Sequence, residues 1–224
     1  MSTAIIGTGN IGTSLARHLA AGGERVILAG RDAATPRALA RELGAGASAA
    51  PVATAIADAD TVIFAVWFDT MQALIAEHAD ALRGKVVVDP SNPIKPAGGG
   101  GFARTLPDGT SGGQVIASRL PADAHFVKAF GSLSAEALAS SANRALAKAV
   151  LFYATDDARA AREIERLITV AGFEPVKAGG VADALRIEVF GDLHQFGGLE
   201  GAVPNRDEAT AAVAAATAAA VGGR

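Results

Sequence analysis

Short apolar runs alternate along this chain with longer segments in which apolar residues recur every three or four positions. Ala4-Ile5-Ile6 is such a run, and residues 11–21 follow it with helical spacing until Gly22-Gly23 ends the helix. Strands that alternate with helices in this way are typical of a parallel sheet wound with helices. The pattern therefore predicts an α/β protein with a doubly wound, mainly parallel sheet.

The same alternation continues for most of the chain. It predicts strands at 26–29, 61–66, 85–89, 126–130, 150–154 and 175–176, and helices at 36–43, 71–82, 157–171 and after Ser134. The rhythm breaks at residues 90–113, which we expect to form a long loop with a glycine-rich insert at 96–113. Within it, the run Gly98–Gly101 is expected to be a mobile segment near the cofactor cleft.

From Gly180 onward the pattern is helical and is interrupted by glycines and a proline. We therefore predict an α/β domain at residues 1–178 and a small, mostly helical C-terminal lobe at 179–224. The last apolar stretch, Ala209 to Val221, is too short to span a bilayer. Its alanine-rich face would allow another helix to approach closely, so we expect a homodimer.

Composition narrows the classes of function. The net charge of −3 argues against a nucleic-acid partner, and the absence of cysteine removes thiolate metal sites and thiol nucleophiles. The histidines show no spacing typical of metal ligands, so no metal is expected. The N-terminus does not read as a signal peptide. These features indicate a cytoplasmic protein with a small-molecule substrate and no membrane association.

The first strand is followed at once by Gly7-Thr8-Gly9-Asn10-Ile11-Gly12, which opens a helix. In this fingerprint Gly7 allows the tight turn, Gly9 lets the backbone approach a pyrophosphate, and Gly12 lets helix and strand pack closely. The free N–H groups of the helix start would then meet the phosphates. The motif indicates a Rossmann-type dinucleotide site, the alternative being a tight turn without a ligand.

The end of the second strand indicates which dinucleotide binds. Sites that select NAD place Asp or Glu there, whereas NADP sites use a cation for the 2′-phosphate. This chain has Gly30 at the expected acidic position and Arg31 directly after it. Asp32 could instead pair with Arg31 or cap the next helix. The sequence favours NADP(H), with Arg31 as the phosphate ligand.

Other strand ends should meet at the same edge of the sheet, where α/β proteins bind ligands. Trp67 follows one strand and could form a wall of the ring pocket or pack structurally. His194 lies between glycines in the C-terminal lobe and could face the substrate or hold a helix end. The candidate substrate residues are Trp67, Phe130, Gly131 and His194.

Four segments together resemble the family of NADPH-dependent reductases of the deazaflavin coenzyme F420. They are Ile6–Gly12, Gly30-Arg31-Asp32, Asp89-Pro90-Ser91-Asn92-Pro93 and Val127-Lys128-Ala129-Phe130. The resemblance implies that Thr8, Gly9, Asn10, Ile11, Gly30 and Arg31 bind NADP, with Val66, Asn92, Pro93 and Ala135 near the ribose and nicotinamide. It also implies coenzyme F420 as co-substrate. Gly131 departs from the family, whose members commonly carry a larger polar residue there.

Direct hydride transfer between two bound cofactors needs no catalytic side chain at the transferring carbon. The sequence accordingly shows no triad, metal cluster or carboxylate pair. Two alternatives remain. A reductase of a small imine or carbonyl compound would need a proton donor, for which His194 and Tyr153 are the candidates. A non-catalytic NADP(H)-sensing module would bind the cofactor without turnover.

Overall fold

The computed structural model describes residues 2–98 and 101–222, the stretch 216–222 as backbone only. The strands are β1 (Thr3–Ile6), β2 (Val26–Ala29), β3 (Ala47–Ala49), β4 (Thr61–Phe64), β5 (Val86–Asp89), β6 (Ile94–Pro96), β7 (Phe102–Arg104), β8 (His125–Ala129), β9 (Val150–Ala154) and β10 (Glu174–Gly179). The α-helices are α1 (Asn10–Ala21), α2 (Ala34–Leu43), α3 (Val52–Asp58), α4 (Phe68–Glu77), α5 (Gly112–Ala117), α6 (Ala135–Ser140), α7 (Ala158–Val170) and α8 (Arg206–Gly222). Two 3₁₀ helices are η1 (Ala79–Leu82) and η2 (Val181–Ile187).

The central sheet has eight strands in the order β10-β9-β8-β5-β4-β1-β2-β3. Its neighbouring strands pair in parallel, except β8 and β9, which are antiparallel. From β1 the chain winds outward to β2 and β3, and then crosses to β4 on the other side of β1. These features confirm the predicted doubly wound, mainly parallel α/β fold.

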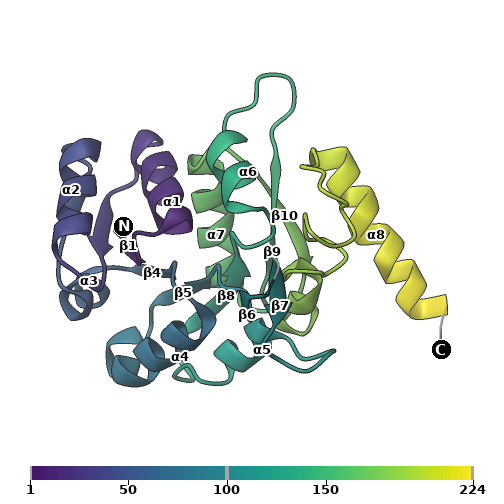
Figure 1. The fold of residues 1–224 in the computed structure, drawn as a ribbon, viewed down its shortest axis with the longest axis horizontal. Coiled ribbons are helices and arrows are strands. Elements are labelled where there is room, and N and C mark those ends of the chain that lie inside the picture. Colours follow the sequence, from purple (N-terminus) through teal and green to yellow (C-terminus); the bar gives the residue numbers. More distant parts are fainter. Residues whose placement is uncertain (1, 99–100, 223–224) are drawn as a thin grey trace.

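Helices cover both faces of this sheet because each central strand is apolar on both sides (Figure 1). Ile5 and Ile63 belong to the hydrophobic cluster formed with α1, α2, α6 and α7. Their strand neighbours Ile6 and Phe64 belong to the cluster formed with α3, α4 and α5. Complete burial of one such side chain contributes about 1.5–3 kcal/mol. The two clusters together fix the three-layer arrangement.

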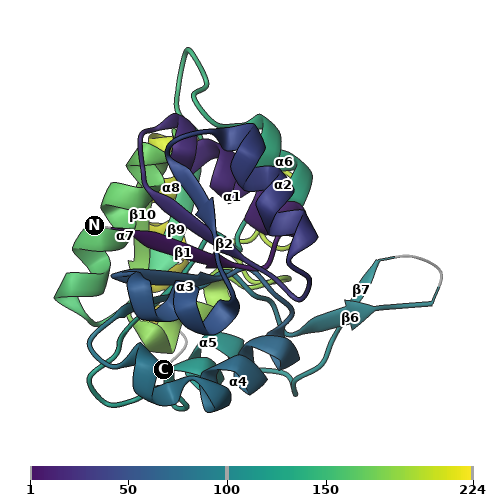
Figure 2. The same cartoon turned by 90° about the vertical axis from the view of Figure 1, so that its left-hand side faces the viewer.

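The segment expected as a loop at 90–113 is instead partly ordered, which corrects the prediction. Strands β6 and β7 pair as an antiparallel hairpin that projects from the body of the molecule (Figure 2). Strands of this length are too short to show an alternating pattern, so the sequence did not reveal them. Gly99 and Gly100, at the centre of the expected mobile run, lie outside the described residues, and its mobility stays a prediction.

Other boundaries also differ from the sequence prediction. The expected helix 71–82 begins at Phe68 and is split into α4 and η1. Strand β3 and helix α3 were not predicted, because the alanine-rich segment 47–58 has no clear period. Helix α5 was hidden by Gly112 and Gly113, which are poor helix formers.

The segment after β10 packs on the face of β9 and β10 opposite to α7. Ala184, Leu193 and Ala209 join Phe152 in one buried cluster there. The start of α8 thus packs on its own chain, and its end extends away from the body in Figure 1. In the described part of the chain, no helix has the length and apolar character needed to cross a bilayer. The domain division at residue 178 stays a prediction.

Candidate functional site

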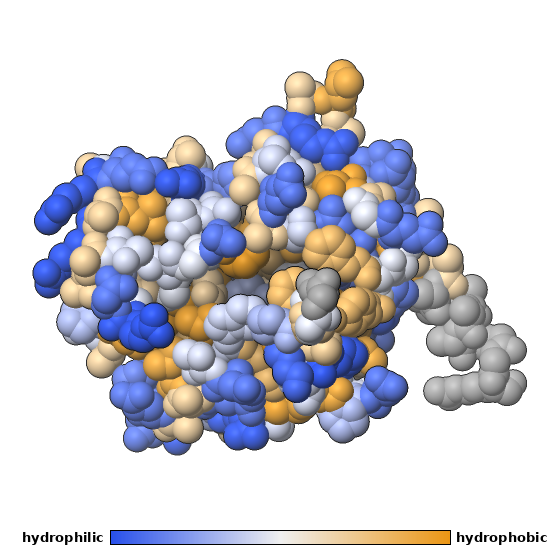
Figure 3. Space-filling view, viewed as in Figure 1, coloured by the Kyte–Doolittle hydropathy of each residue, from blue (hydrophilic) through white to orange (hydrophobic). Residues whose placement is uncertain are grey.

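The carboxyl ends of β1 and β4 open onto a cleft of about 720 Å³ where the winding of the sheet reverses. Open α/β sheets bind their ligands at such switch points. This face of the molecule is hollowed near its middle, with apolar side chains around the hollow (Figure 3). The predicted cofactor residues that line the cleft are Gly7, Thr8, Gly9, Asn10, Ile11, Gly30, Arg31, Val66, Asn92 and Ala135. Gly12 and Pro93 are buried and do not line it.

The turn between β1 and α1 provides a place for a pyrophosphate. Gly7 has a φ of +105°, and a Cβ on it would lie 2.3 Å from the Ala65 carbonyl oxygen. A Cβ on Gly12 would lie 1.9 Å from the Gly7 oxygen, so this glycine permits the close packing of the helix. Helix α1 begins after Gly9 with no side-chain cap and no acidic residue in its first turn. Its unpaired N–H groups therefore fit a bound phosphate.

Arg31 lies at the end of β2 on the wall of the cleft and is exposed. Asp32 does not neutralise it, because its carboxylate accepts a 2.8 Å hydrogen bond from the Thr35 backbone N–H. This bond lowers the pKa of Asp32. Among the described residues, Arg31 makes no ion pair with an acidic side chain. It is available for an external phosphate.

A buried ion pair supports the floor of the cleft. The Lys128 Nζ atom on β8 lies 2.8 Å from Asp89 Oδ2 on β5, and both side chains are almost completely buried. Lys128 also donates to the Ser91 carbonyl, and Asp89 Oδ1 accepts bonds from the Ser91 N–H and hydroxyl at 2.8 and 2.6 Å. Every charge of the pair is therefore satisfied. The pair fixes the Pro90–Asn92 loop, which lines the cleft.

Asn92 joins three segments at this loop. Its Nδ2 donates to the Gly131 carbonyl at 3.1 Å, and its Oδ1 accepts from the Val189 N–H at 2.7 Å. Gly131 has no room for a side chain, because a Cβ would lie 2.7 Å from the Pro90 oxygen. The departure from the family at this position therefore has a local packing reason. It brings the backbone of β8 close to the wall of the cleft.

His194 lines the cleft but is almost completely buried. Burial lowers its pKa to about 4, the Gly131 backbone opposes this shift, and the charge of Lys128 adds to it. The ring is therefore neutral at pH 7. Its Nδ1 accepts a 2.9 Å hydrogen bond from the Phe196 N–H, which places the ring proton on Nε2. His194 thus both lines the cleft and holds the backbone around Phe196.

This pKa shift predicts a specific dependence of stability on pH. The unfolded chain takes up a proton on His194 below its ordinary pKa of 6.5, whereas the native state does so only near 4. The free energy of unfolding should therefore fall as the pH drops from about 6.5 to 4, by at most about 3 kcal/mol from this group. We expect denaturant titrations of the wild type to show this loss. The difference between wild type and His194→Gln should grow over the same interval, and a constant difference would contradict the assignment.

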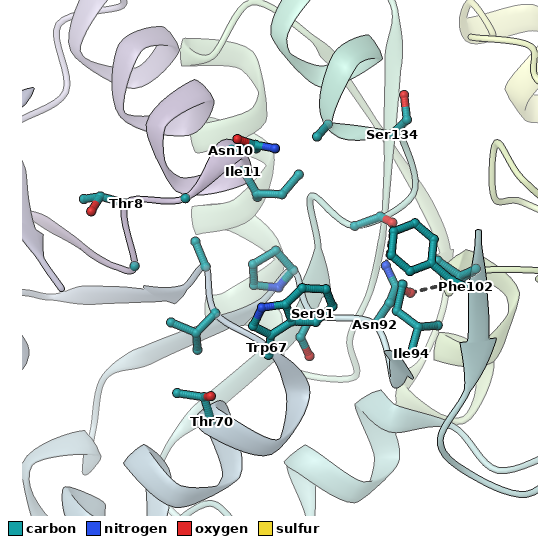
Figure 4. A pocket seen from close by; sticks show the side chains of 18 of the residues that line it. Thr8, Asn10, Ile11, Trp67, Thr70, Ser91, Asn92, Ile94, Phe102 and Ser134 are labelled. Carbon is teal, nitrogen blue, oxygen red and sulfur yellow. Dashed lines mark hydrogen bonds between the residues drawn. The ribbon is translucent and has the colours of Figure 1, made fainter. Parts of the chain in front are cut away.

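The other half of the cleft is aromatic. Trp67 caps the start of α4 and is 57% exposed, and Phe102 and Phe196 are also exposed on the wall. Trp67 and Phe102 flank Ser91 and Asn92 in Figure 4. Phe130 does not line the cleft and is fully buried, which corrects its prediction as a substrate residue. Its φ of +66° turns the chain so that Gly131, not Phe130, reaches the wall.

Tyr153 is not placed to donate a proton in the cleft. It is buried in the cluster formed with α7 and does not line the wall. Its hydroxyl donates to Glu165, and burial with this bond raises the pKa of the phenol. The prediction of Tyr153 as a proton donor was therefore wrong, because the side chain points to the face of the sheet that α7 covers.

Several cleft residues were not predicted from the sequence. Ile94 and Phe102 come from the unpredicted hairpin, and Val189 comes from the segment after η2. Phe196 stands in the glycine-rich stretch that drew attention to His194, so a local signal was present. Lys128 was detectable as a lysine inside an otherwise apolar strand, although its pairing with Asp89 depends on the register of β5 and β8.

Fold and cleft together define a Rossmann-type dinucleotide-binding protein. Residues 2–93, from β1 to the loop after β5, match the family model described as NADP oxidoreductase, coenzyme F420-dependent. Through these residues the chain belongs to this family of NADP-dependent oxidoreductases, as the four sequence segments predicted.

Similar proteins agree with this assignment. The chain is 29% identical over 148 residues to the F420-dependent NADP reductase of Methanothermobacter marburgensis, which covers 62% of this chain and 66% of that protein. It is 27% identical over 184 residues to metalloreductase STEAP3 of Rattus norvegicus, covering 82% of this chain but only 35% of that protein. The crystal structure of hypothetical protein SMa0349 from Sinorhizobium meliloti is similar with a TM-score of 0.80 and 29% identity, over 92% of this chain and 96% of that one.

Proposed function

We propose that the chain is an NADP(H)-dependent oxidoreductase that transfers a hydride between the nicotinamide and coenzyme F420. One observation carries this proposal. A single cleft combines an uncapped helix start and the unpaired Arg31 at one end with exposed aromatic side chains at the other. Membership of residues 2–93 in the F420-dependent family supports the same function.

The residues of the cleft have distinct roles in this proposal. The N–H groups at the start of α1 bind the pyrophosphate, and Arg31 binds the 2′-phosphate. Val66, Asn92 and Ala135 hold the ribose and nicotinamide, while the buried Gly12 and Pro93 support this wall from behind. When bound, NADPH supplies two electrons and one proton as a hydride, and solvent supplies the second proton that the acceptor takes up. The protein contributes alignment and the exclusion of water.

Reduction of a small imine or carbonyl compound receives less support from the geometry. Such a reaction needs a proton donor beside the substrate. Tyr153 lies outside the cleft, and His194 is neutral with its Nδ1 atom occupied by the Phe196 N–H. Transfer to a deazaflavin requires no such donor.

Absorbance of NADPH under anaerobic conditions tests the proposed function. Purified protein should oxidise NADPH when coenzyme F420 is present, and the deazaflavin absorbance should fall in equal molar amount. Without F420, NADPH should stay reduced. Tight binding of NADPH with no oxidation by F420 or by small imines would favour the sensing module instead.

We also propose a cytoplasmic homodimer that acts on small molecules and binds neither nucleic acid nor membrane. The alanine-rich helix α8 supports the dimer, since it permits close approach of a second helix. Light scattering during gel filtration tests the proposal: twice the mass of the chain is expected, and a mass of about 22.4 kDa would refute it.

A further inference from the structure

Exposed aromatic side chains gather in one half of the cleft. Trp67, Phe102 and Phe196 are 57%, 43% and 51% exposed, and all three line its wall. Large apolar side chains kept in water at one concave site mark a binding surface. The three come from separate parts of the fold: the end of β4, the projecting hairpin, and the loop after η2.

The position of each aromatic ring is supported by neighbouring contacts. Trp67 stands at the first turn of α4, and its carbonyl accepts the Met71 N–H. The backbone of Phe196 donates to His194, whose ring centre lies 5.7 Å from that of Phe196. Phe102 is paired with Pro96 across the hairpin. The rings are therefore held by ordered backbone while their faces remain open.

This half of the cleft carries no charged side chain among the described residues. The charged groups of the wall, Arg31 and Asp32, both lie at the end of β2. Lys95 alternates with Ile94 and so points to the other face of the hairpin, and the Arg104 guanidinium donates to the Thr110 carbonyl. Nothing in this half is suited to bind an anionic group.

Resting on the proposed function, we infer that Trp67, Phe102 and Phe196 form an aromatic subsite that recognises the acceptor by its planar ring alone. The ring stacks on the aromatic side chains, and the anionic side chain that coenzyme F420 carries adds no affinity. A deazaflavin without that side chain, such as 5-deazariboflavin, is then an equivalent ligand.

Trp67 is the single tryptophan of the chain and reports binding directly. Protein saturated with NADP⁺ is titrated with 5-deazariboflavin and with coenzyme F420 while tryptophan fluorescence is followed. Both should quench Trp67, with dissociation constants within about threefold of each other. Because stacking of one ring on one aromatic side chain contributes about 1–3 kcal/mol, Phe102→Ala should raise both constants about tenfold. Phe102→Leu, which keeps the apolar bulk, should have a smaller effect.

Phe190→Ala is the matched control, since Phe190 is 51% exposed but does not line the cleft. It should leave both constants unchanged. Binding of F420 more than tenfold tighter than 5-deazariboflavin, with a preference that shrinks at high salt, would overturn the inference while leaving the proposed function intact. Equal binding of both compounds without oxidation of NADPH by either would support the subsite and refute the proposed function.

Discussion

Replacement of Arg31 by alanine should weaken NADPH about 10- to 100-fold and leave NADH almost unchanged. The guanidinium is exposed on the cleft wall and unpaired within the described chain, so a 2′-phosphate would gain charge-assisted hydrogen bonds of about 1.5–3 kcal/mol. NADH lacks that phosphate and cannot lose the interaction. Quenching of Trp67 by each nucleotide measures the two dissociation constants.

Arg41→Ala provides the control for this substitution. Arg41 is exposed in the last turn of α2 and does not line the cleft, so its removal changes the net charge equally. We expect at most a twofold effect on either nucleotide, as for a distant surface charge. Equal weakening of NADPH and NADH by Arg31→Ala would show that Arg31 does not select the phosphate.

Lys128→Met should destabilise the native state by about 3–5 kcal/mol, because it leaves the buried carboxylate of Asp89 without its partner. For a chain of this length, each kcal/mol shifts the melting temperature by about 2–4 °C, so a fall of about 6–20 °C is expected. The Ser91 carbonyl loses a donor in the same variant. Thermal unfolding followed by circular dichroism measures the effect.

Two further variants separate stability from positioning. Arg17→Met breaks a half-exposed pair with Glu42 and should cost at most about 1 kcal/mol. Combining Lys128→Met with Asp89→Leu removes both buried charges and should recover part of the stability. The double variant should still bind NADPH more weakly than the wild type, because Ser91 and Asn92 lose their anchor. Full recovery of NADPH affinity would mean that the pair serves stability alone.

Local signals in the sequence were sufficient for the phosphate end of the cleft. The turn from Gly7 to Gly12 depends on close backbone contacts that only glycine allows, and Arg31 follows β2 directly. The apolar strands predicted the sheet because buried parallel strands are continuous apolar runs.

The acceptor end depends on contacts between distant segments, and these left little trace in the sequence. Phe102 reaches the cleft through a hairpin whose strands are too short to show a period. Val189 is placed by a hydrogen bond from its N–H to Asn92, ninety-seven positions earlier in the chain. Phe130 was assigned to the substrate because it ends a strand, and its positive φ could not be foreseen from a bulky residue.

The central claim is that a hydride passes directly between two cofactors bound in this cleft. It is tested by following deuterium from NADPH labelled at C4, in each of the two stereochemical forms, into coenzyme F420. Direct transfer predicts that one labelled form delivers its deuterium to C5 of the reduced deazaflavin without loss to water. Reduced F420 that carries no deuterium with either form, while NADPH is consumed, would contradict the account.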